Sequence, residues 1–111
     1  MLDTSPLSAV VERFADRLRA APQSRLQQGA AAAALELARE LAARARTLEG
    51  LPPHPMPDEG IFVVGDQVAV AGRDLAEALR SVRAQDGAKA PSEMLDEAVR
   101  LVEQAEVRAM R

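Results

Sequence analysis

The chain has 111 residues, no cysteine and a formal net charge of −3 at pH 7. That length fits a single domain, 1–111, and the lack of cysteine excludes disulfides, thiolate metal sites and cysteine nucleophiles. The first residues lack the basic and apolar regions of a signal peptide, and no apolar stretch reaches the roughly 20 residues that a membrane span needs. We therefore expect a cytoplasmic domain that does not bind membranes.

Alanine is abundant, whereas Phe14 and Phe62 are the only aromatic residues. Alanine has the highest helix propensity but buries little surface, so helices should form readily and pack around small side chains. Since a core with few large residues gains burial when two copies associate, we expect a homo-oligomer. The basic residues are nearly all arginine and alternate with acids. This pattern is typical of solvated helix surfaces in a high-GC bacterial protein and argues against nucleic-acid binding.

The first helix is expected to begin at Ser5, which can cap it, followed by Pro6 in the first helical position. Pro22 ends it, because the residue before a proline is disfavoured in the α region. Between them runs one apolar stripe at helical spacing, made of Leu7, Val10, Val11, Phe14, Leu18 and Ala21.

A second helix is predicted over 24–48, with Gly50 as its C-terminal stop. At about 1.5 Å per residue it would be roughly 37 Å long. The segment 51–60 that follows contains four prolines and is expected to form a stiff, extended crossover to the next helix.

The third segment allows two interpretations. As a helix over 58–84 it carries a continuous apolar stripe and beside it a ridge of small residues, which would pack closely on the alanines of 31–45 in the second helix. Alternatively, the apolar runs on both sides of 65–67 form a short β-hairpin at 61–71. The ridge consists of Gly65, Ala69, Gly72 and Ala76.

Pro91 and Ser92 predict the start of a fourth helix, with Ser92 as its cap and acids in its first turn. Four helices of this kind predict an all-α, up-down helical bundle in which the central pair is longest. The tips of that pair would protrude and leave part of the apolar stripe uncovered unless a second chain packs there.

Two pairs of carboxylates have the spacing of metal ligands. Asp74 and Glu77 lie three residues apart, as do Glu93 and Asp96, so each pair projects from one helix face. The pattern resembles the all-α nucleoside triphosphate pyrophosphohydrolases, which have glutamate where this chain has Asp74. The resemblance implies an Mg²⁺-dependent pyrophosphohydrolase in which these four acids hold the metal. This is the alternative function.

Other catalytic chemistry finds no support in the sequence. His54, the sole histidine, lies among prolines without a partner at ligand spacing, and the serines are explained as caps, loop or surface residues. We therefore expect no catalytic residue and no cofactor. The leading expectation is a non-catalytic module that docks, through apolar helix stripes, onto a second copy of itself or onto another protein.

Overall fold

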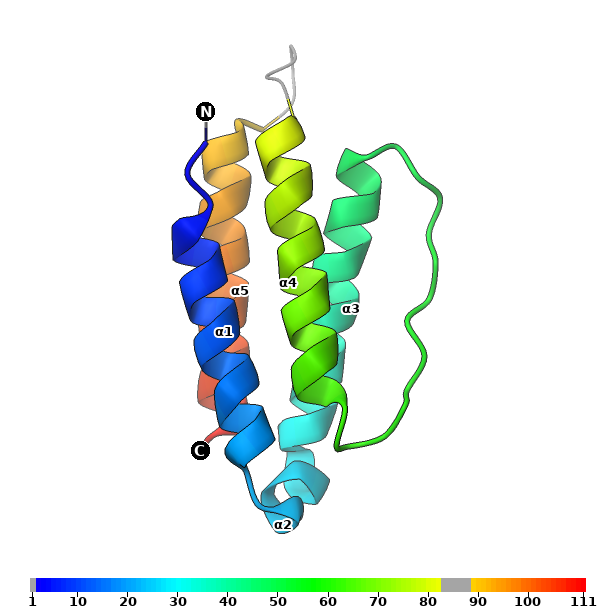
Figure 1. Cartoon of the computed structure of the whole chain (residues 1–111), viewed down its shortest axis with the longest axis vertical. Coiled ribbons are helices and arrows are strands. Elements are labelled where there is room, and N and C mark those ends of the chain that lie inside the picture. The colour runs from blue at the N-terminus through cyan, green and yellow to red at the C-terminus, as the bar shows by residue number, and fades with distance from the viewer. Residues whose placement is uncertain (1, 83–88) are drawn as a thin grey trace.

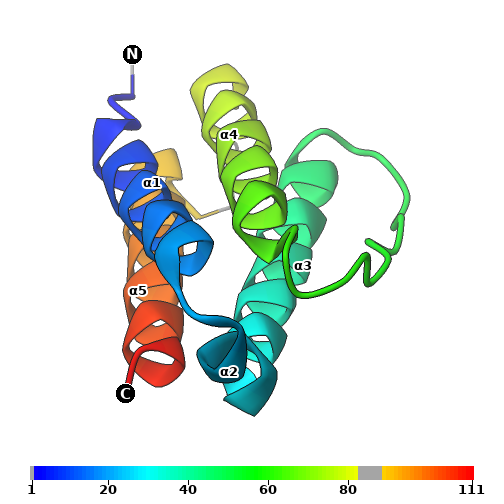
Figure 2. The same ribbon diagram turned by 60° about the horizontal axis from the view of Figure 1, so that its bottom comes forward.

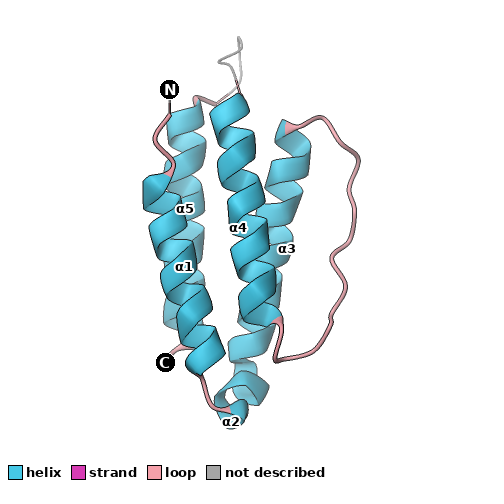
Figure 3. Cartoon of the chain, viewed as in Figure 1, coloured by secondary structure: helices cyan, strands magenta, loops and turns pink. Residues whose placement is uncertain are grey.

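A computed structural model describes residues 2–82 and 89–111, and within those ranges every regular element is helical (Figures 1 and 3). The predicted all-α bundle is therefore confirmed. The alternative β-hairpin at 61–71 is wrong, because residues 61–63 form a turn and helix follows. The elements are α1 (Ser5–Ala20), α2 (Gln23–Arg25), η1 (Leu26–Ala30), α3 (Ala31–Leu48), α4 (Val64–Ser81) and α5 (Pro91–Ala109).

The outer helices begin close to the predicted residues. Thr4 rather than Ser5 caps α1, and its carbonyl accepts the N–H groups of Leu7 and Ser8 at 3.1 Å each. In α5 the cap is Ala90 rather than Ser92. Both helices carry a proline in the first turn, where its missing N–H has no helical partner to lose.

The second helix is broken near its start. Its residues divide into α2, the π-helical turn η1 and α3, and Gly29 within η1 has a φ of 135°. The stop at Gly50 is as predicted. Gly50 N–H donates to the carbonyl of Thr47 at 3.1 Å and Leu51 N–H to that of Arg46 at 2.9 Å. These two bonds form a Schellman motif around the left-handed Gly50 (φ 71°).

A Gly29→Ala variant is expected to lose about 1 kcal/mol of unfolding free energy, since side chains rarely adopt a positive φ and the strain outweighs the helix propensity gained. No neighbouring atom would touch an added Cβ, so the cost is purely conformational. Urea denaturation measures it. An unchanged or higher stability would show that the turn relaxes into regular helix.

The segment 51–60, here called the strap, carries the chain back along the whole of α3. Arg46 Nε donates to the carbonyl of Pro52 at 2.6 Å, and Arg39 Nε, two turns earlier in α3, donates to that of Met56 at 3.0 Å. The strap therefore runs opposite to α3, and α4 starts beside the beginning of α3 (Figure 1). At the strap's far end, Gln67 Nε2 of α4 donates to the carbonyl of Pro57 at 2.9 Å.

The structure differs from the predicted bundle in three details. The extended crossover makes α3 and α4 parallel, so the order is not strictly up-down. The third helix runs over Val64–Ser81 rather than over 58–84, and Val82 after it is extended. The central pair is not longest, because α3 and α4 have 18 residues each and α5 has 19.

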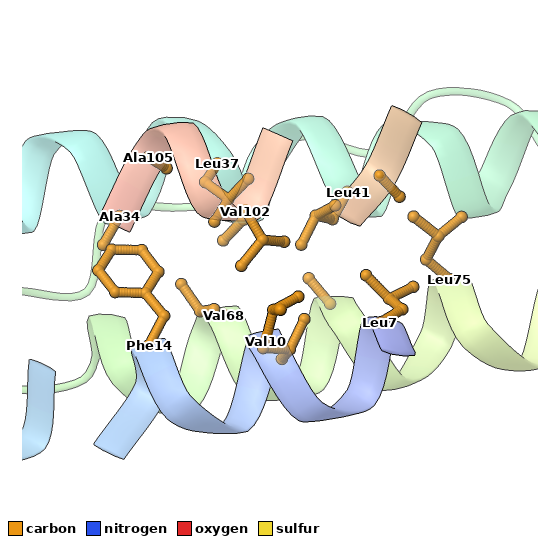
Figure 4. Packing of buried hydrophobic residues seen from close by; sticks show 14 of the residues in the cluster. Leu7, Val10, Phe14, Ala34, Leu37, Leu41, Val68, Leu75, Val102 and Ala105 are labelled. Atoms are coloured by element: carbon orange, nitrogen blue, oxygen red, sulfur yellow. The ribbon is translucent and has the colours of Figure 1, made fainter. Parts of the chain in front are cut away.

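Helix α4 lies between α1 and α3, and α5 packs on the other side against the same two helices (Figure 2). The shared core is built from leucines, valines, alanines and a single aromatic ring (Figure 4). Its largest fully buried side chains are Phe14, Leu7, Leu41, Leu75, Leu79, Val68 and Val102.

The ridge of small residues on α4 faces α1. A Cβ added to Gly72 would lie 2.6 Å from Cγ1 of Val11, and one added to Gly65 would lie 3.1 Å from the carbonyl oxygen of Ala15. Ala69 and Ala76 line the same α1–α4 groove. The predicted partner, the alanines of 31–45, is therefore incorrect for these glycines: α3 contacts a different face of α4.

Candidate functional site

The four candidate metal ligands point away from the core. Asp74 and Glu77 are exposed on α4, and Glu93 and Asp96 are exposed on α5. These two helices lie diagonally across the bundle and touch little. Among residues 2–82 and 89–111, no three acidic or histidine side chains gather where they could hold a metal ion. The structure does not bring the four carboxylates together.

An ion cluster with one buried carboxylate and two half-exposed arginines joins α5 to α1 instead. Glu106 of α5 is only 5 % exposed. Its Oε1 accepts from Arg13 Nη2 at 2.7 Å, and its Oε2 lies 3.2 Å from Arg17 Nη1. Burial by itself raises the pKa of the Glu106 carboxyl, but the hydrogen bonds and charges of the two guanidinium groups outweigh it, so the pKa lies below its usual range.

This cluster links α1 to α5 and stabilises their packing; it is not a reactive site. Both carboxylate oxygens are occupied by guanidinium groups, which leaves the carboxylate poorly placed to act as a base or a metal ligand. Sequence reasoning missed Glu106. The available signal was an acid beside Ala105 on the buried stripe of the fourth helix, combined with two arginines four residues apart on the first.

A hollow of about 300 Å³ lies between α3 and the strap, and we call it the strap hollow. Its walls are mainly apolar, with the side chains of Ala42, Leu51 and Met56 and the proline rings of the strap. Three basic side chains line it and no acidic one does. The full lining is Arg39, Ala42, Ala43, Arg46, Thr47, Leu51, Pro53, His54, Pro55 and Met56.

A second hollow, of about 250 Å³, lies across Ala43 and Thr47 from the first, where α3, α4 and α5 meet. Leu75 and Met94 are among its apolar lining residues. Glu40 and Arg44 also line it, with Arg44 Nε 2.9 Å from Glu40 Oε1, and Arg44 pairs in addition with Glu97 of α5 at 3.2 Å. The charges around this hollow therefore compensate one another.

A few large apolar side chains stand outside the core. Phe62 is 73 % exposed and Val70, two turns into α4, is 52 % exposed. Between them in sequence, Asp66 pairs with Arg19 of α1 at 2.7 Å. On α5, Val107 is 61 % exposed among polar neighbours.

Comparison with protein-family models, with curated proteins and with solved structures finds no match to this chain. None of the helices in the described ranges has the length and hydropathy that crossing a membrane requires.

Proposed function

We propose that this chain is a non-catalytic helical interaction module that pairs with a second copy through the face around Phe62 and Val70. The observation that carries the proposal is the position of Phe62. The chain has two aromatic residues; Phe14 fills the core, and Phe62 is presented to solvent.

Exposing a phenylalanine forgoes about 1.5–3 kcal/mol of burial, which a partner surface would recover. Aromatic side chains are also enriched at the centres of interfaces, where a few residues supply most of the binding free energy. Asp66, which lies between Phe62 and Val70 in the sequence, has its charge compensated by Arg19 of α1.

The proposal predicts that the wild type sediments as a dimer at high concentration and that Phe62→Ser weakens dimerisation about tenfold or more, in line with the loss of 1.4 kcal/mol or more of apolar burial. Sedimentation equilibrium over a range from micromolar to millimolar chain measures the dissociation constant. The variant leaves the core untouched, so its thermal melting at low concentration should match the wild type.

Val107→Ser is the matched control, because Val107 is about as exposed as Phe62 but lies on α5. It should leave the dissociation constant unchanged. A wild type that remains a monomer at millimolar concentration, or an equal effect of the two substitutions, contradicts pairing through this face.

A further inference from the structure

We propose that the strap hollow is a binding site for a small carboxylate with a short apolar chain, held by Arg39 and Arg46. This surface is separate from the face around Phe62, so the inference stands independently of the proposed dimer.

The electrostatic argument rests on two positioned guanidinium groups. Each uses its Nε–H for a strap carbonyl, Arg39 at 3.0 Å from Met56 O and Arg46 at 2.6 Å from Pro52 O. An arginine has five N–H donors in a planar fork, so four remain on each group. In the described part of the chain neither forms an ion pair. Both line the same hollow, on a protein whose net charge is −3.

The lining next to this pair is apolar and suits an apolar chain rather than a bare ion. Ala42, Leu51 and Met56 and the rings of Pro53 and Pro55 form it. A volume of about 300 Å³ is at the lower end of small-molecule sites, which span roughly 300–1,000 Å³. A carboxylate head at the guanidinium groups would thus leave room for a short chain.

The neighbouring hollow shows why the site is assigned to the strap side. It is similar in size and also apolar, but its one arginine, Arg44, is already paired with Glu40 and Glu97. This hollow could therefore hold an apolar molecule, but among its described lining residues it has no unpaired arginine that would favour an anion.

The test is an NMR titration of the full ¹⁵N-labelled chain at pH 7 with octanoate, octan-1-ol and inorganic phosphate as separate probes. Octanoate is expected to shift the amides of Ala42, Thr47 and Met56 saturably. Octan-1-ol should bind about tenfold more weakly or worse, because one charge-assisted hydrogen bond is worth about that factor. Phosphate should give no saturable shift, since it has no apolar chain.

Arg39→Gln and Arg46→Gln should each weaken octanoate binding about tenfold while leaving octan-1-ol unaffected. Both retain a side-chain N–H for the strap carbonyl. Arg100→Gln, on the exposed side of α5, is the matched control and should bind like the wild type. Ala42→Phe, which fills the hollow and keeps both arginines, should abolish binding.

Four results would overturn the assignment: no octanoate binding at millimolar concentration, equal affinity for octan-1-ol, unchanged affinity in both arginine variants, or shifts confined to the residues around Leu75 and Met94. Saturable phosphate binding at the same residues would make the hollow a general anion site and would also refute a preference for apolar carboxylates.

Discussion

An Arg13→Met/Arg17→Met double variant is expected to lose about 3 kcal/mol of unfolding free energy at pH 7, because it leaves the Glu106 carboxylate buried without a partner. The loss is bounded, since the carboxyl can escape the penalty by taking up a proton. Urea denaturation followed by circular dichroism gives the difference. Arg19→Met is the matched control: its partner Asp66 is exposed, so its loss should stay under about 1 kcal/mol.

At acid pH, the double variant should approach the wild type in unfolding free energy. In the wild type the pKa of Glu106 is lowered on folding, so the ion cluster stabilises the fold at neutral pH and that contribution is lost as pH falls through the lowered pKa. In the double variant, burial without guanidinium groups raises the pKa, and stability instead falls as pH rises. The difference between the two proteins should therefore shrink from pH 7 to pH 3. A pH-independent difference would show that the arginines act through packing alone.

Gly72→Ala is expected to destabilise the fold by about 2 kcal/mol, although alanine is the better helix former by about 1 kcal/mol. The added Cβ would lie within 2.7 Å of both Cγ atoms of Val11, and Val11 is buried at 3 % exposure with a stiff, β-branched side chain. Relief requires α1 and α4 to move apart. The overlap should therefore outweigh the gain in propensity.

A double-mutant cycle with Val11→Ala isolates this contact. Removing the Val11 methyl groups creates a cavity that costs stability on its own, but in the double variant the new Cβ occupies part of that space. We expect the combined loss to be smaller than the sum by about 1 kcal/mol or more. If the losses of the two single variants simply add, the close approach of α1 and α4 does not limit the size of the side chain at position 72.

Features encoded by a few neighbouring residues could be predicted. The proline-marked starts of α1 and α5 and the stop at Gly50 each follow from one backbone constraint, and the helical stripes follow from periodicity. The predicted start of α4 at 58 is wrong because Ile61 continues the apolar stripe of the helix into the turn that precedes it. The start at Val64 depends on a tertiary contact, because the strap reaches α4 there and the carbonyl of Pro57 accepts a hydrogen bond from Gln67 Nε2.

The candidate sites depended on which helices are neighbours and on the path of the crossover, and an apolar stripe along one helix encodes neither. Grouping Asp74 and Glu77 with Glu93 and Asp96 required α4 and α5 to be neighbours, whereas they are diagonal in the bundle. The strap hollow required knowing that the crossover folds back over α3, next to Arg39 and Arg46. The exposure of Phe62 could not be predicted from periodicity either, because this residue belongs to no helical stripe and lies in the turn before α4.

The strap has a consequence for the direction of a whole helix. Eighteen residues of α3 rise about 27 Å, and extended proline-rich chain covers about 3.1 Å per residue, so roughly nine residues are the shortest connection that can return to the start of α3. The fifteen residues between α3 and α4 exceed that minimum. Below it, α4 would have to turn over and run antiparallel to α3. The length of this connection therefore permits the parallel polarity of α4, and with it the set of α4 side chains that meet α1.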